Sequence, residues 1–149
     1  MTGEEVSTVE AGAGRERPGV VEPVLDFDLR SLVAAVNAED NQRAFFGVTL
    51  HMPSGLVCGD VIGREAYLDA WEELLRDARG KGAEQFATFF RDTEQILDEV
   101  GIASVPSLPR WIHLRDVRIL TGPQILRSPL WRGRLADVAG WSVGAPSSD

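Results

Sequence analysis

The segment Val48–Gly63, VTLHMPSGLVCGDVIG, constrains the fold more than any other part of the chain. Two apolar runs flank the turn residues Pro53-Ser54-Gly55, which is the pattern of a β-hairpin over about Phe45 to Ile62. Its strands carry apolar side chains on both faces, with Val48, Leu50 and Met52 on one face of the first, Leu56, Cys58 and Ile62 on one face of the second, and Phe45, Val57 and Val61 on the opposite faces. A hairpin that is apolar on both faces needs cover on both sides, which the rest of the chain must supply.

Three helical patterns surround the hairpin. Upstream of it, an apolar stripe has Asp26 or Asp28 placed to cap its start and Asn37 near its end. Downstream, the spacing predicts helices over Arg64–Arg79 and Glu84–Val100, joined by a glycine-containing turn. The three stripes are Leu25, Leu29, Leu32, Val33 and Val36; Tyr67, Trp71, Leu74, Leu75 and Ala78; and Phe86, Phe89, Phe90, Thr93, Leu97 and Val100. We interpret the aromatic residues of the last two stripes as core packing.

The last third of the chain returns to strand patterns. RWIHLRDVRIL sets Ile112, Leu114 and Leu120 against Trp111, Val117 and Ile119. A turn at Gly122-Pro123 and a loop ending at Pro129 precede LWRGRLADVAGWSVG, where Gly133 and Gly140 bend the strand or divide it in two. The order predicts an α+β fold: a small bent-strand β-barrel or sheet, with the N-terminal helix at one end and a helical pair inserted between the second and third strands.

Length and composition fit one such unit. A chain of 149 residues that is 44% hydrophobic buries one core, and we expect a single α+β domain over residues 23–144. Residues 1–22 and 145–149 hold few aliphatic side chains, so both are expected to be disordered tails. No membrane span or secretory leader is recognisable, which predicts a cytoplasmic protein without membrane contact. The single cysteine, Cys58, lies in an apolar strand and reads as a small buried hydrophobe.

Two resemblances rest on the strand motifs. WIHLRDVRIL followed by RGRLADVAGWSVG is similar to the paired strands of Sm-like small barrels, which read L-x-D-V-x-I and R-G-x-x-I/L. GVTLHMPSGLVCGDVIGREAYLDAW, with IHLRDVRILTGPQILRSPLWRGRLADVAGWSVG, resembles the type U accessory proteins of gas vesicle gene clusters (GvpU-like) over roughly Phe45 to Gly144. Cys58 stands where that pattern favours serine, and Trp141 where it favours phenylalanine. This resemblance implies a non-enzymatic protein at gas vesicles, which contacts the vesicle shell or other accessory proteins.

Nothing in the sequence predicts a catalytic centre or a cofactor. His51 and His113 lie in strands among apolar neighbours, and no Cys or Glu stands at metal-ligand spacing from either. A pair of histidines brought together across the sheet is able to bind a metal or act as a base, but structural histidines explain the pattern better. We therefore predict no enzyme, no metal site and no cofactor.

Charge leaves two functions open. The net charge of −8 disfavours binding to nucleic acid or anionic lipid unless cations gather on one face. A set of arginines does gather in the last third: Arg110, Arg115, Arg118, Arg127, Arg132 and Arg134. Strand alternation places Arg132 and Arg134 on one face, as candidates for partner binding or as an ordinary solvated face. The first function is promotion of vesicle assembly or clustering through weak multivalent contacts of a self-associating protein, and the alternative is an Sm-like RNA-binding module.

Overall fold

The computed structural model describes residues 26–39, 46–78, 80, 82–101 and 108–145. The expected N-terminal tail lies outside this part of the chain, as do residues 146–149 of the expected C-terminal tail. Leu25 and Phe45, which were assigned to the first helix and to the hairpin, also fall outside it.

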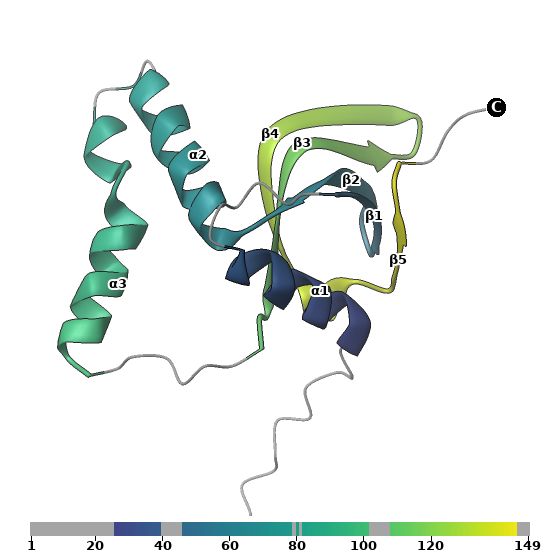
Figure 1. Ribbon diagram of the computed structural model, residues 1–149. Helices are drawn as coiled ribbons and strands as arrows, with labels where there is room; N and C mark the ends of the chain where they lie inside the picture. The colour runs from purple at the N-terminus through teal and green to yellow at the C-terminus, as the bar shows by residue number, and fades with distance from the viewer. Residues whose placement is uncertain (1–25, 40–45, 79, 81, 102–107, 146–149) are drawn as a thin grey trace, which may run out of the picture.

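Helix α1, Phe27–Ala38, begins at Asp26, so of the two expected capping residues Asp26 is the cap. Its carboxylate accepts a hydrogen bond from the Leu29 N–H at 3.0 Å and another from the Trp141 indole at 3.0 Å. These bonds, with the Leu29 N–H first, keep the pKa of Asp26 below its ordinary value. Figure 1 shows α1 lying across one end of a curved sheet, against which it buries Leu29, Val33 and Val36.

Five strands form one antiparallel sheet in the order β4-β3-β2-β1-β5. They are β1 (Gly47–Met52), β2 (Gly55–Ile62), β3 (Trp111–Thr121), β4 (Gln124–Arg134) and β5 (Gly140–Val143). The sheet curls strongly (Figure 1) but stays open, because no ladder joins β4 to β5 within the described residues. The predicted α+β class, with its N-terminal helix and inserted helices, is confirmed.

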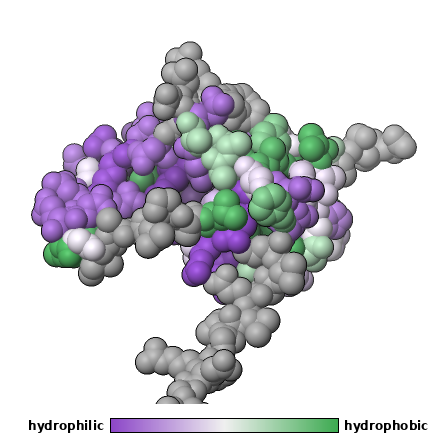
Figure 2. Space-filling view, turned by 60° about the horizontal axis from the view of Figure 1, so that its bottom comes forward, coloured by the Kyte–Doolittle hydropathy of each residue, from purple (hydrophilic) through white to green (hydrophobic). Residues whose placement is uncertain are grey.

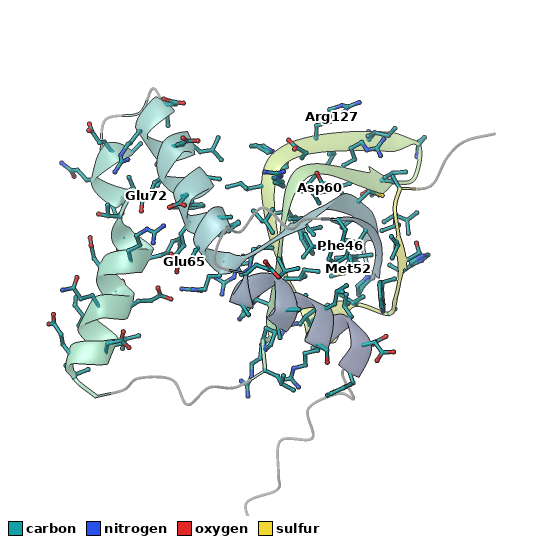
Figure 3. The ribbon with its side chains drawn as sticks, viewed as in Figure 1. Phe46, Met52, Asp60, Glu65, Glu72 and Arg127 are labelled. Atoms are coloured by element: carbon teal, nitrogen blue, oxygen red, sulfur yellow. The ribbon has the colours of Figure 1, made fainter. Side chains whose placement is uncertain are left out.

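The core lies between the concave face of the sheet and α1. It consists of Leu29, Val33, Val36, Val48, Leu50, Val57, Val61, Ile112, Leu114, Val117 and Leu135. Phe46 and Met52 point into the curve of the sheet (Figure 3) and pack against this cluster. Cys58 is buried on the other face of β2, where its sulfur lies 3.5 Å from the Thr49 hydroxyl, which donates its proton to the Gly144 carbonyl at 2.7 Å. The hairpin therefore has buried side chains on both faces, as expected.

A β-bulge in β3 changes which side chains face the core. The register between β2 and β3 shifts by one residue between Cys58 and Asp60, and Asp116 adopts a left-handed φ of 52°. Val117 and Ile119 therefore join Ile112 and Leu114 on the core side, so their predicted placement on opposite faces is wrong. The bulge brings backbone close to Gly59, where a Cβ atom would lie 2.9 Å from the carbonyl oxygen of Arg115.

The expected loop ending at Pro129 is also wrong, because β4 begins at Gln124, directly after the turn at Gly122-Pro123. A proline inside a strand is tolerated here because β4 is an edge strand. Beyond Arg134 the chain forms a short 3-10 helix, η2 (Leu135–Asp137), before β5 starts at Gly140. The last stretch is thus divided in two, as the glycine pattern predicts.

The inserted helices project to one side of the sheet (Figure 1). They comprise α2 (Arg64–Asp77), the 3-10 helix η1 (Glu84–Phe86) and α3 (Phe89–Glu99), so the expected second helix is broken near its start. Gly63 offers no side chain to cap α2, and Asn37 of α1 instead accepts a hydrogen bond from the Arg64 N–H at 2.9 Å. Leu68 is buried in α2, whereas no residue of α3 is buried.

Candidate functional site

The predicted arginine set lies mainly on the convex face of the β3–β4 hairpin. The ladder places Arg118 opposite Arg127, His113 opposite Arg132, and Trp111 opposite Arg134. Arg132 and Arg134 do share a face, as the alternation predicts, but their surroundings differ. The set is therefore not one uniform stripe of free cations.

Arg134 is neutralised within its own segment. Its guanidinium makes two hydrogen bonds to the carboxylate of Asp137, at 2.9 and 3.0 Å, in a bidentate ion pair. The pair is largely exposed to solvent. Arg134 thus fits the solvated-face interpretation better than Arg132 does.

Arg132 has no ion-pair partner among the described residues. Its guanidinium carbon lies 4.2 Å from the centroid of the Trp111 ring, the geometry of a cation–π contact. Partial burial, followed by the nearby positive charge of Arg64, lowers the pKa of Arg132 below its ordinary value, while Tyr67 acts in the other direction. Among the described residues, no carboxylate forms an ion pair with this guanidinium.

His113 lies beside Arg132 on the next strand and is 4% exposed. Its ring stands 4.6 Å from that of Tyr67, centroid to centroid, and its Nδ1 atom has no hydrogen-bond partner in the described structure. Burial, reinforced by Arg132 and Arg64, lowers the pKa of His113 from 6.5 to about 4. The imidazole is therefore neutral at pH 7.

These groups line a cleft of about 790 Å³ between the helical pair and the ends of β3 and β4. Its lining is mixed. Tyr67, Leu68, Phe90, Leu97, Leu108 and Trp111 are apolar or aromatic, whereas Arg64, Glu65, Glu94, Asp98, Arg110 and Arg132 are charged. Arg64 lies in the same cleft, where it forms an ion pair with Glu94 across α2 and α3. The cleft thus combines aromatic walls with one unpaired guanidinium and one unpartnered imidazole nitrogen.

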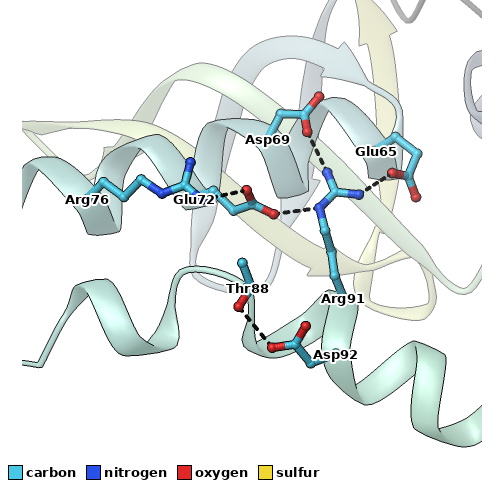
Figure 4. A network of polar contacts seen from close by, with 7 residues as sticks. All are labelled: Glu65, Asp69, Glu72, Arg76, Thr88, Arg91 and Asp92. Carbon is cyan, nitrogen blue, oxygen red and sulfur yellow. Dashed lines mark hydrogen bonds and ion pairs between the residues drawn. The ribbon is translucent and has the colours of Figure 1, made fainter.

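Charge holds α3, the outer wall of the cleft, against α2. Figure 4 shows Arg91 of α3 reaching three carboxylates of α2, Glu65 at 2.7 Å and Asp69 and Glu72 at 2.5 Å each. The hydrogen bond to Glu65 is the largest cause of a raised pKa for Arg91. Glu65 and Glu72 both come from the side of α2 that faces α3 (Figure 3).

The interpretation of the helical aromatic residues as core packing is wrong for Phe86 and Phe89, which are exposed. Trp71 and Phe90 do meet edge to face, with ring centroids 5.3 Å apart. The other large apolar side chains of this region are exposed, among them Phe86, Phe89, Ile96, Leu97 and Val100. Figure 2 shows the resulting surface, in which hydrophilic side chains cover most of the helical-pair side and small apolar groups interrupt them.

The two histidines are not brought together. His51 pairs with Leu56 at one end of β2, whereas His113 pairs with Ile62 at its other end, six residues away and hence roughly 20 Å along the strand. His51 is exposed and His113 is buried. Within the described residues, no group of three side chains is arranged to hold a metal ion.

Sequence reasoning found Arg132 but missed its surroundings. Trp111 and Tyr67 were assigned to packing, and His113 was treated as a structural histidine. A signal was present in the order Trp111-Ile112-His113, because strand alternation places the indole and the imidazole on one face. The helices that complete the cleft give no such local signal, since their contact with this face is set by tertiary structure.

Comparison with known protein families gives a match over most of the chain. A family model described as gas vesicle protein GvpU-like matches residues 26–146. No curated protein and no solved structure matches the chain. The described part of the chain holds no helix long and apolar enough to cross a membrane.

Proposed function

This chain belongs to the GvpU-like family of gas vesicle proteins, and from that membership we propose that it is a non-enzymatic accessory protein that promotes vesicle assembly or clustering. The observation that carries the proposal is the match over residues 26–146, which spans every described helix and strand. Its partners would be the vesicle shell or other gas vesicle proteins, and its place in the cell the vesicle surface.

The convex face of β3–β4 supports a role in contacting partners. Arg132 and Arg134 lie there on one face, and Arg132 has no ion pair among the described residues. Exposed charges contribute little to affinity individually, but they steer encounter and add up when many copies engage one surface. We therefore expect single contacts to be weak and clustering to fall as salt shortens the Debye length below about 10 Å.

The test is co-flotation of the purified protein with purified gas vesicles, together with light scattering of vesicle clusters. The variant is Arg132→Glu with Arg134→Glu, and the matched control is Arg118→Glu with Arg127→Glu, which makes the same charge change at the other end of the hairpin. We expect clustering to fall at least fivefold for the first pair and less than twofold for the control. Absence of co-flotation at any salt concentration would reject direct vesicle binding.

We also propose self-association, because β4 and β5 each have an edge without a strand partner among the described residues. At the tip of the β3–β4 hairpin Ile125 and Leu126 are 59% and 54% exposed, next to the unpaired edge of β4. Pro129 and the arginines of β4 limit but do not abolish edge pairing. Light scattering between 1 and about 100 μM, a range that covers weak association, should report a rising mass, which Ile125→Lys with Leu126→Lys lowers.

RNA binding is the alternative function. An arginine over an indole, beside a tyrosine, is the combination that single-strand binders use for stacking. The net charge of −8 and the carboxylates Glu94 and Asp98 on the cleft wall oppose it. We expect no tight binding to mixed single-stranded RNA at physiological salt, and a sub-micromolar Kd with a steep salt dependence would favour the alternative.

A further inference from the structure

The imidazole of His113 is a polar group without a partner at the wall of the cleft. Its residue is 4% exposed, and Nδ1 makes no hydrogen bond within the described structure. Leaving a buried polar atom unpaired carries a free-energy penalty, so native proteins retain few such atoms without a reason. A group that enters the cleft and pairs with Nδ1 would recover this cost.

The guanidinium of Arg132 is the second unmatched group, and it stands next to the first. The two residues are directly opposite on β3 and β4, and Trp111 holds the guanidinium plane from one side. Arg64, the cation across the cleft, is already paired with Glu94. An added negative charge would therefore find its strongest attraction at Arg132.

The rest of the cleft selects what carries that charge. Aromatic and aliphatic side chains from Tyr67, Phe90, Leu97 and Leu108 line it, and at about 790 Å³ it has room for several side chains. Glu65, Glu94 and Asp98 also line the cleft, so a polyanion would be repelled there. A single carboxylate on a segment that also carries apolar side chains matches Arg132, which has no ion pair among the described residues, and the apolar part of the lining.

We propose that this cleft binds a glutamate or aspartate side chain carried by a partner-protein segment that also bears apolar side chains, with Arg132 and His113 as the groups that recognise the carboxylate. The carboxylate accepts an N–H from the guanidinium and the Nδ1–H of the neutral imidazole, and charge-assisted hydrogen bonds of this kind are the stronger class. The identity of the partner as a gas vesicle protein rests on the proposed function. The recognition of the carboxylate does not depend on that identity.

Two capped peptides that differ in one group test the chemistry. The probes are acetyl-Leu-Phe-Glu-Leu-amide and its glutamine counterpart, titrated into the full chain at pH 7 by calorimetry and by the His113 ring proton shifts. We expect the glutamate peptide to bind at least tenfold more tightly and to shift the His113 signal. Equal affinities, or binding that leaves the His113 signal unchanged, would overturn the proposal without any need for a variant.

Arg132→Gln and Arg127→Gln locate the site. Both are exposed arginines of β4, but Arg127 does not line the cleft. We expect Arg132→Gln to reduce the preference for glutamate to less than twofold and Arg127→Gln to retain it, with both variants keeping native amide spectra. A preference that survives Arg132→Gln contradicts the proposal, as does displacement of the glutamate peptide by oligouridylate at lower concentration.

Vesicle co-flotation in parallel separates this proposal from the proposed function. If the chain co-floats with vesicles but shows no preference for the glutamate peptide, the cleft proposal fails and the accessory role stands. If it prefers the glutamate peptide but never co-floats, the accessory role in its direct-binding form fails and the carboxylate site stands.

Discussion

The curved sheet and the helical pair are stabilised by different forces. Between the sheet and α1, eleven buried apolar residues form a continuous cluster. In α3 no residue is buried, and contact with α2 depends on Arg91, on the Arg64–Glu94 pair and on aromatic edges such as Trp71–Phe90. One part of the chain is thus closed by apolar burial and the other mainly by charge.

This difference bears on where the protein can change shape. Apolar burial contributes about 25 cal/mol per Å² and is not screened by salt. An exposed ion pair contributes about 0–1 kcal/mol and weakens as salt rises. We therefore expect the sheet with α1 to behave as the stable unit and α3 to open locally at lower free energy. The cleft lies between the two, so its outer wall is the more mobile one.

The largest effect should come from removing the same side chain in each region. Leu114 is fully buried in the sheet, while Leu97 of α3 is 40% exposed. We expect Leu114→Ala to lower the free energy of unfolding by about 2–5 kcal/mol and Leu97→Ala by less than about 1 kcal/mol. Chemical denaturation measures both, and similar losses would show that α3 belongs to the same cooperative core.

A smaller effect is expected at the β3 bulge. A Cβ atom on Gly59 would lie 2.9 Å from the Arg115 carbonyl oxygen and 3.3 Å from the Leu114 Cβ, so backbone would have to move. We expect Gly59→Ala to cost about 1–3 kcal/mol by overpacking. Gly140→Ala is the control, because nothing lies within 4 Å of its added Cβ, and equal costs would remove the steric explanation.

Sequence patterns predicted the sheet better than the helical pair. Alternation and turn residues identified the hairpin, and helical spacing with a capping aspartate identified α1, because these signals are local. The bulge at Asp116 was missed, since an extra residue in a strand inverts the alternation without a distinctive residue type. The five residues between the Gly122-Pro123 turn and Pro129 were assigned to a loop because the edge position of their strand is a tertiary property.

The site was predicted only in part for the same reason. Alternation placed Arg132 and Arg134 on one face, but nothing local indicated that Asp137 neutralises Arg134 or that Trp111 lies under Arg132. The aromatic stripe of α3 was assigned to the core because periodicity reveals an apolar face and does not reveal what covers it. The cleft lies between these two features, the surroundings of Arg132 and the apolar face of α3, and neither was predicted correctly.

His113 lies at the boundary of the two regions, and its titration should make the free energy of unfolding depend on pH. Its pKa is about 4 in the native protein and about 6.5 in the unfolded chain. Below pH 6.5 the unfolded state therefore binds more protons, so the free energy of unfolding falls as pH drops towards 4, by about 1 kcal/mol between pH 7 and 5.5. Above pH 7 this effect is absent.

Two variants isolate that titration. His113→Gln should lose this part of the pH dependence, whereas His51→Gln, at an exposed position, should retain it. The comparison uses denaturant unfolding at pH 7.0, 6.0 and 5.5. These pH values lie above the ordinary pKa values of carboxylates, so the titration of Asp and Glu side chains contributes little there. Parallel curves for the native chain and His113→Gln would mean that the pKa of His113 is the same in the folded and the unfolded state.

The smallest global effect, and the most local one, is expected at Arg91. Arg91→Gln removes the cation that Glu65, Asp69 and Glu72 share, and it leaves three carboxylates of α2 repelling one another. We expect the free energy of unfolding to fall by less than about 1 kcal/mol, while amide hydrogen exchange in α3 speeds up and that in β3 does not. Arg76→Gln is the control, because Arg76 makes a single exposed contact of 3.5 Å with Glu72.

At 1 M salt, where the Debye length is about 3 Å, the native chain should approach the exchange rates of Arg91→Gln in α3 alone. If exchange in α3 were instead unchanged by both the variant and the salt, its exposed apolar residues would have to be held by contacts other than these charges.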